Sequence, residues 1–264
     1  MTEIKAKLNL IRLIPYKKES AKFNMAADVF LLKNSALPTL RFYGWKKPTL
    51  SFGKNKTNLS DIDFDFCKAN NFDFVLRPSG GKSVFHSKEL TYCLTCPLHI
   101  FPYSILETYR IINQAFIKAL QNQLKINLIM TPEKKRAAHS SSCFQEISSW
   151  EINQDGKKIV GSAQLRKAKS ILQHGSILLD LDFSLWQKIW PAISKPQMQK
   201  RITSLNLLHA KKHSPAKLAD LIFPDLCLAW QTKSFTKALS SHERRKINLI
   251  AKEWPSFPAL KKHK

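Results

Sequence analysis

The sequence has no long apolar run, few acidic residues and an odd number of cysteines. No apolar stretch among its 264 residues approaches the roughly 18–20 residues that a membrane-spanning helix needs. The apolar segment LNLIRLI near the N-terminus is interrupted by Arg12 and is typical of a strand rather than of a signal peptide. Five cysteines in a chain of this length indicate reduced thiols rather than a disulfide framework. We therefore expect a cytoplasmic protein without a membrane partner.

Acidic residues are scarce in relation to basic ones. The chain has 43 Lys and Arg against 19 Asp and Glu, a net charge of +24, and residues 195–264 alone hold 15 basic and 4 acidic residues. Such a field attracts polyanions, which include nucleic acid, anionic membranes and acidic proteins. No helix-turn-helix, zinc-finger or RNP pattern is present, so we do not expect nucleic acid as a partner. A non-catalytic basic binding module stays open as an alternative function.

The order of patterns along the chain predicts an α+β protein. Apolar residues make up 44% of the sequence, enough for a proper core. Alternation and helical spacing predict strands at 8–14, 39–43, 49–52, 72–76, 84–96, 125–130, 150–153, 157–165 and 170–179, and helices at 20–33, 58–70 and 104–124. From residue 183 onward the pattern is mostly helical. We expect a mixed β-sheet core flanked by helices, with residues 1–264 forming one domain whose part from about 185 to 264 is helical and basic.

Two short sequence motifs predict where individual elements begin or turn. Ser104 followed by Glu107 is a capping box that predicts the start of the long helix. Asp155-Gly156 between two strand patterns predicts a β-hairpin. The segment 131–149, which lies between the predicted strand at 125–130 and the hairpin, has no periodicity. Loops of that length inside compact domains are usually functional or mobile.

Two of the seven glycines stand together, in the segment FVLRPSGGKSVFH. The letters Gly81-Lys82-Ser83 resemble the end of a phosphate-binding P-loop, but that loop needs a glycine where this chain has Leu76. Two consecutive glycines let backbone N–H groups approach a ligand closely. The turn therefore suits a carboxylate, a phosphate or a thioester carbonyl, and a hairpin connection without a ligand is equally consistent with the segment.

Four sequence blocks resemble, in order, the signatures of the lipoate–biotin protein ligase superfamily. They are RFYGWKKPTLSFG (41–53), RPSGGKSVFHSKELTY (77–92), GKKIVGSAQLR (156–166) and ILQHGSILLDLD (171–182). The resemblance covers about residues 8–185 and implies the biotin/lipoate A/B protein ligase catalytic fold. One position departs from the family pattern, because the first of two arginines before the glycine turn is replaced by Leu76 and only Arg77 is kept.

A fifth block separates two chemistries within that superfamily. SSSCFQEISSWEI (140–152) is similar to the block that surrounds the nucleophilic cysteine of ligase-like octanoyl-[acyl-carrier-protein]:protein N-octanoyltransferases. ATP-dependent lipoate–protein ligases typically have an Asn-Asp pair in this region and no cysteine. The resemblance favours an acyltransferase, with the ligase, which would need ATP and Mg²⁺, as the alternative. An amidotransferase that moves octanoyl groups between lipoyl domains is a further variant.

Cys143 is the candidate nucleophile on physical grounds as well. It follows a serine run and the basic run 134–136, where nearby cations favour the thiolate. Cys93 and Cys96 are three residues apart in a strand and so face opposite sides, which makes a poor metal pair. The remaining cysteines, Cys67 and Cys227, lie in helical patterns that suit small buried apolar residues. No metal site is expected.

Lys158 is the second candidate catalytic residue. The resemblance assigns it to the acyl carbonyl, where an ammonium opposes the charge that develops on the oxygen. Lys157 would face the opposite side of the same strand and be solvated. His86 could shape the pocket or assist proton transfer, and a purely structural histidine is the open alternative. The matching blocks imply the following substrate-binding residues: Arg77, Ser79, Gly80, Gly81, His86, Gly161, Ser162, Gln164 and His174.

The resemblance also implies substrates and partners. The donor would be octanoyl-acyl carrier protein, and the acceptor a lysine of a lipoyl domain such as glycine cleavage H protein or the E2 subunit of a 2-oxoacid dehydrogenase. The octanoyl group would pass through a thioester on Cys143. Because conversion of a thioester to an amide is downhill, no cofactor is expected.

Overall fold

The computed structural model describes residues 8–34, 36–54, 59–131 and 151–255. The larger of two sheets has the strand order β11-β1-β2-β6-β10-β9-β8-β7. The pairs β11–β1 and β1–β2 are parallel and the other pairs antiparallel, so the sheet is mixed. Its strands are β1 (Leu10–Glu19), β2 (Thr39–Trp45), β6 (Glu89–Pro97), β7 (Ile129–Met130), β8 (Ile152–Gln154), β9 (Lys157–Arg166), β10 (Ser170–Leu178) and β11 (Lys233–Thr236).

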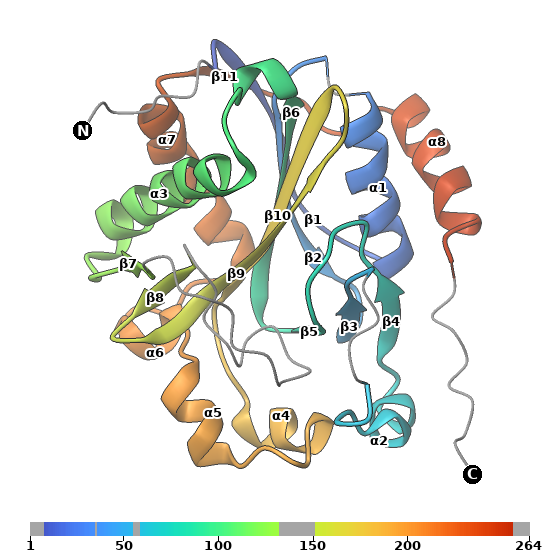
Figure 1. Cartoon of the computed structure of the whole chain (residues 1–264), viewed down its shortest axis with the longest axis vertical. Coiled ribbons are helices and arrows are strands. Elements are labelled where there is room, and N and C mark those ends of the chain that lie inside the picture. The colour runs from blue at the N-terminus through green and yellow to red at the C-terminus, as the bar shows by residue number, and fades with distance from the viewer. Residues whose placement is uncertain (1–7, 35, 55–58, 132–150, 256–264) are drawn as a thin grey trace.

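A second, smaller sheet has the order β4-β3-β5. Its strands are β3 (Thr49–Phe52), β4 (Asp73–Leu76) and β5 (Val84–His86). Around it lie three short helices, α2 (Phe64–Ala69), α4 (Phe183–Ile189) and α5 (Lys195–Arg201) (Figure 1). Aromatic residues from both sheet and helices, among them Phe52, Phe85 and Trp186, fill the space between them. This arrangement gives the small sheet a core of its own beside the large one.

Long helices cover the two faces of the large sheet (Figure 1). On one face lie α3 (Ile105–Leu124) and α7 (Pro215–Trp230), and on the other α1 (Ala21–Lys33) and α8 (Ser241–Lys252). The remaining helices are short, α6 (Leu205–Leu208) and the 3₁₀ turn η1 (Leu98–Ile100). No helix in the described ranges is both long and apolar enough to cross a lipid bilayer.

Strand β2 shows how the two faces of the large sheet differ. All seven of its residues are buried, as expected for a central strand covered on both faces. Leu40 and Phe42 pack into the core with α3 and α7, whereas Tyr43 and Trp45 belong to a smaller cluster on the α1 side. The alternation of side chains along a strand thus separates a continuous apolar core from a face that carries polar and aromatic groups.

The predicted fold class and several local predictions are confirmed. The capping box forms, since Ser104 accepts a hydrogen bond from Glu107 N and the Glu107 carboxylate accepts one from Ser104 N. The β8–β9 hairpin turns at Asp155 and Gly156, both with positive φ (49° and 73°), which is the type I′ geometry that Asp-Gly favours. Cys93 and Cys96 lie on opposite faces of β6, in different apolar clusters.

Other predicted elements are wrong in extent or type. The strand predicted at 84–96 is two strands in different sheets, because the chain bends after β5 where the His86 ring bonds Glu89 three residues later. The helix predicted at 58–70 begins only at Phe64, where the Asp63 side chain accepts from Phe66 N. The strand predicted at 125–130 comprises only Ile129–Met130. In the C-terminal part, the segment Lys233–Thr236 is not helical but extends the sheet as an exposed edge strand beside β1.

Candidate functional site

A pocket lies where the small sheet meets the α1 face of the large sheet. It encloses about 470 Å³ of space between the atoms, its open mouth included. Strands β2, β6, β9 and β10 supply one side, and β5 with the residue after β4 supplies the other. The lining residues are Met25, Tyr43, Trp45, Arg77, Val84, His86, Thr91, Glu151, Lys158, Gly161, Ser162, Ala163, His174, Gly175 and Ser176.

Lys158 lies in the wall of this pocket and its side chain is only 1% exposed. Its neighbour Lys157 is exposed, as the alternation of the strand predicts. A register shift in the hairpin places Ile152 opposite Val160 but Asn153 opposite Lys158, so the strand bulges beside the lysine. The Lys158 ammonium donates to the Glu151 carboxylate over 2.7 Å. A buried cation is thus held at the pocket by a buried anion.

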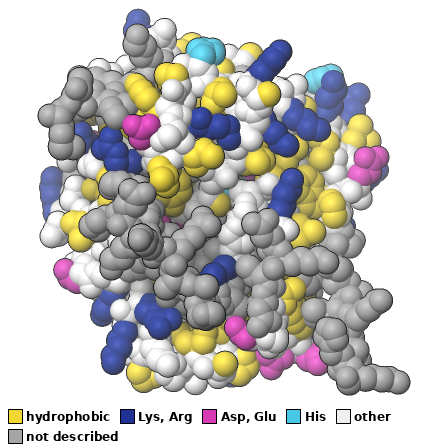
Figure 2. All heavy atoms as spheres, in the orientation of Figure 1, with side chains coloured by type: hydrophobic (Ala, Val, Ile, Leu, Met, Phe, Trp, Pro, Cys, Tyr) yellow, Lys and Arg dark blue, Asp and Glu magenta, His cyan; other side chains and the backbone are white. Residues whose placement is uncertain are grey.

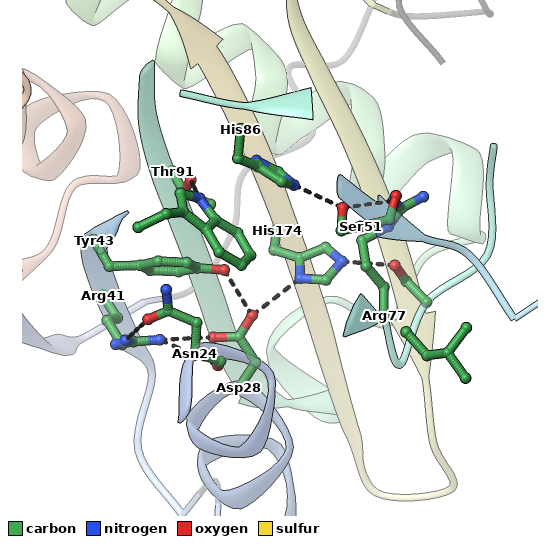
Figure 3. A network of polar contacts seen from close by, with 12 residues as sticks. Asn24, Asp28, Arg41, Tyr43, Ser51, Arg77, His86, Thr91 and His174 are labelled. Carbon is green, nitrogen blue, oxygen red and sulfur yellow. Dashed lines mark hydrogen bonds and ion pairs between the residues drawn. The ribbon is translucent and has the colours of Figure 1, made fainter. Parts of the chain in front are cut away.

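A chain of hydrogen bonds links the glycine turn to helix α1 through His174. The His174 Nε2 atom lies 2.6 Å from the Ser79 hydroxyl, and its Nδ1 lies 3.0 Å from the Asp28 carboxylate. The Asp28 carboxylate also accepts hydrogen bonds from the Tyr43 hydroxyl and the Arg41 guanidinium (Figure 3). Asp28 and Arg41 form a buried ion pair. Burial, followed by the Asp28 charge, raises the pKa of Tyr43 well above its usual value. Because both ring nitrogens of His174 have a hydrogen-bond partner, its imidazole is held in one orientation.

A second chain of hydrogen bonds, again from a serine through a histidine to a carboxylate, includes His86. Its Nε2 lies 2.6 Å from the Ser51 hydroxyl and its Nδ1 lies 2.7 Å from the Glu89 carboxylate. The Trp45 indole stacks on the imidazole with 4.1 Å between ring centroids and donates to Glu89 over 3.0 Å. His86 thus contributes to the pocket wall and is also hydrogen-bonded as a structural histidine would be. The geometry accommodates both roles that the sequence left open.

The glycine turn is braced by Arg77, which is buried. One guanidinium nitrogen donates to the Ser51 carbonyl and hydroxyl oxygens, and the other donates to the carbonyls of Gly80 and Lys82. Gly81 has a φ of 96°, a conformation that favours glycine. Ser79, Gly80 and Gly81 are not among the residues that line the pocket, so any contact of their N–H groups with an acyl carbonyl stays a prediction.

Ser162 and Gln164 are engaged with residues under helix α3. The Ser162 hydroxyl lies 2.8 Å from the Tyr92 hydroxyl, and Gln164 donates to the Gln173 side chain over 3.2 Å. Gln173 in turn donates to Tyr92 and to Asn113 of α3. Ser162 lines the pocket and Gln164 does not. Gly161, next to Ser162 on β9, also lines it.

The candidate nucleophile Cys143 lies outside the described residues, so its predicted role stays a prediction. The four described cysteines are free thiols. Burial raises the pKa of each of them, that of Cys67 to about 12, which makes them poor nucleophiles near neutral pH. Within the ranges that the structure describes, no group of three or more His, Cys, Asp or Glu residues is arranged to hold a metal ion.

Sequence reasoning missed the acidic partners of the site. Glu151 pairs with Lys158, Asp28 with His174, and Glu89 with His86. Glu89 was within reach of a local argument, because it follows His86 by three residues. Asp28 is 146 residues from His174 along the chain, and no local pattern could have joined them.

Comparisons with known proteins agree with the fold and with the family resemblance. The family model described as the lipoyl protein ligase A/B catalytic domain matches residues 20–225. The chain is 40% identical over 182 residues to an octanoyltransferase LipM of Kyrpidia tusciae, and 37% identical over 183 residues to one of Bacillus subtilis. Each of these matches covers 65% of this chain and 66% of the relative, so the chain spans just under two thirds of the relatives' length.

Solved structures show the same fold at low sequence identity. A lipoate-protein ligase A bound with ATP superposes with a TM-score of 0.75 at 16% identity, covering 93% of both chains. A bipartite lipoate protein ligase from Thermoplasma acidophilum, studied with its E2 lipoyl domain, gives a TM-score of 0.73 at 15% identity, covering 93% of this chain and 91% of that one.

Proposed function

The chain belongs to the lipoyl protein ligase A/B catalytic family, and we propose that it transfers octanoyl groups to lipoyl domains through a thioester on Cys143. The donor is octanoyl-acyl carrier protein and the acceptor is a lysine of a lipoyl domain, such as that of glycine cleavage H protein or of an E2 subunit. The observation that carries the proposal is the buried ammonium of Lys158 in the pocket wall. Relatives at 37–40% identity that are named octanoyltransferases support it.

The reaction has two acyl transfers that need no external energy source. The thiolate of Cys143 attacks the thioester carbonyl carbon of the donor, and the carrier leaves as a thiolate that takes up a proton. The neutral amine of the acceptor lysine then attacks the octanoyl-enzyme. The amide forms, the Cys143 thiolate leaves, and the amine's proton passes to it. Because an amide replaces a thioester, neither ATP nor Mg²⁺ takes part.

Lys158 stabilises charge on the carbonyl oxygen in both steps. In each tetrahedral intermediate this oxygen is an anion, and an ammonium already fixed in a buried site stabilises it without reorganisation. The bulge in β9 and the hydrogen bond from Thr203 N to the Lys158 carbonyl, at 3.0 Å, fix the lysine's backbone. Lys158 is thus pre-positioned for the intermediate.

The pocket and the surface suit the substrates. Burial of the octanoyl chain contributes on the order of 5 kcal/mol at about 0.8 kcal/mol for each CH₂, which is enough to select for chain length. Lys and Arg side chains far outnumber acidic ones on the face of the molecule in Figure 2, which suits the acidic surfaces of carrier proteins and lipoyl domains. The free thiols of the described residues agree with a cytoplasmic location.

Intact-mass spectrometry tests the proposal. The protein is mixed with octanoyl-acyl carrier protein in the absence of ATP, and we expect a gain of one octanoyl group that hydroxylamine removes. Cys143→Ala should show no gain, and Cys67→Ala, which removes a described buried thiol, should label like the wild type. Labelling that requires ATP and free acid, and that persists in Cys143→Ala, would instead establish the lipoate–protein ligase.

A further inference from the structure

Ser176 is a buried residue of the pocket lining whose hydroxyl is not hydrogen-bonded. It lies on β10, lines the pocket and is only 2% exposed. Among the described residues, its Oγ atom has no hydrogen-bond partner. A buried hydroxyl of this kind destabilises the folded protein, because it has given up its hydrogen bonds to water. Such a group in the wall of a pocket is explained if a bound ligand is its partner.

The other side-chain hydroxyls of the pocket lining differ from Ser176, because each is bonded to a neighbouring side chain. They and their partners are Tyr43 with Asp28, Thr91 with Glu89, and Ser162 with Tyr92. A ligand that took a hydrogen bond from one of these hydroxyls would have to compete with a protein partner. The Ser176 hydroxyl can donate to a ligand without that cost.

The neighbours of Ser176 across the sheet leave its hydroxyl available to the pocket. Ser176 is opposite Thr91 on one side and Gly161 on the other, and directly opposite residues share a face of the sheet. Gly161 presents no side chain, and the Thr91 hydroxyl donates to Glu89. His174 lies two residues before Ser176 on β10 and therefore faces the same side, where it lines the pocket.

We propose that Ser176 is a substrate-binding residue that donates a hydrogen bond to the acyl carbonyl oxygen. An octanoyl thioester group has one strong acceptor, this oxygen, because its chain is hydrocarbon and its sulfur accepts weakly. A carbonyl oxygen has two lone pairs, so it can accept from the Ser176 hydroxyl and the Lys158 ammonium together. The contact strengthens as the oxygen becomes an anion in the tetrahedral intermediate. This inference rests on the proposed function, because it places the octanoyl group in this pocket.

Two ligands that differ in one carbonyl group test the proposal by isothermal titration calorimetry. They are octanoyl-pantetheine and octyl-pantetheine, the thioether in which a CH₂ replaces the C=O. The full-length Cys143→Ala protein serves as the parent, so that Cys143 cannot be acylated during the titration. Adding Ser176→Ala should weaken the binding of octanoyl-pantetheine about three- to tenfold, the worth of one hydrogen bond. The affinity for octyl-pantetheine should change less than about twofold.

Thr95 provides a matched control. Like Ser176 it is buried, at 0% exposure, and its hydroxyl has no hydrogen-bond partner among the described residues, but it does not line the pocket. Thr95→Val, which keeps the shape of the side chain, should bind both ligands as the parent does. Neither substitution should lower the Tm by more than about 2 °C, because neither removes a hydrogen bond within the protein.

Two kinds of result would overturn the proposal. One is a folded Ser176→Ala variant that binds octanoyl-pantetheine as well as the parent, or that loses affinity for both ligands equally. The other is a larger fall in Tm, because the hydroxyl would then have a partner within the protein. None of these measurements involves acyl transfer. Failure of Cys143-dependent labelling would therefore refute the proposed function and leave the carbonyl contact standing, and the converse also holds.

Discussion

Replacing Gly53 by alanine should displace the glycine turn, and the matched change at Gly80 should not. A Cβ atom at Gly53 would lie 1.9 Å from the Gly81 carbonyl oxygen and 2.7 Å from the Gly80 carbonyl carbon. A Cβ atom at Gly80 would meet no heavy atom within 4 Å, and Gly80 has no positive φ. The two substitutions add the same methyl group to neighbouring parts of the site, so their difference reports only the packing.

The structure sets the size of the effect. Since Cβ atoms almost never approach other heavy atoms within 3.0 Å, the turn must retreat from Gly53 by at least about 1 Å. Overpacking of this kind typically costs about 1–3 kcal/mol. At about 2–4 °C for each kcal/mol in a domain of this size, Gly53→Ala should lower the Tm by roughly 2–12 °C. A displacement of about 1 Å beside a reacting group can reduce the rate about 100-fold.

The assays are thermal unfolding and octanoyl transfer from acyl carrier protein to a lipoyl domain. Gly80→Ala should stay within about 1 °C of the wild-type Tm and keep most of its activity. If Gly53→Ala unfolds and reacts like the wild type, the close approach of the two backbone segments does not hold the turn. If Gly80→Ala is the more damaging change, the turn is held by contacts other than those described.

Three further changes test separate parts of the structure. Asp28→Asn leaves the buried Arg41 without its anion, so urea unfolding should show that the free energy of unfolding falls by about 3–5 kcal/mol. A decrease below about 1 kcal/mol would contradict the buried ion pair. Glu243 pairs with Arg12 and has a pKa lowered to about 2, so its stabilisation is complete above about pH 4.5 and is lost as the pH falls toward 2. The Tm difference between wild type and Glu243→Gln should shrink over that range, and a constant difference would contradict the pairing. Because burial raises the pKa of the described thiols, iodoacetamide at pH 8 should label the native wild type rapidly at one site, and Cys143→Ala at none.

Local chemistry explains which parts of the fold could be predicted. The Asp155-Gly156 turn needs positive φ at two successive residues, which few other pairs tolerate, so its position followed from two letters. The resemblance pointed to Lys158, and the exposure of its neighbour Lys157 then followed from the alternation of a strand. By contrast, the edge strand Lys233–Thr236 is exposed throughout and has no apolar alternation, so only its pairing with β1 identifies it.

The polar contacts of the site depend on tertiary structure and could not be read from spacing. Ser79 and His174 are 95 residues apart, and their contact exists because the small sheet packs against the large one. Glu151 lies near Lys158 in sequence, but a register shift in the hairpin decides which residues face each other. The sequence therefore identified the lysine and left its counter-ion unassigned.

A chase experiment on the isolated octanoyl-enzyme tests the covalent relay most directly. The labelled protein is freed of donor, mixed with a lipoyl domain in the absence of ATP, and followed by intact mass in both proteins. We predict that the octanoyl group leaves the enzyme and appears as an amide on the acceptor lysine, at least as fast as steady-state turnover. An octanoyl-enzyme that persists while fresh donor acylates the acceptor would contradict the relay.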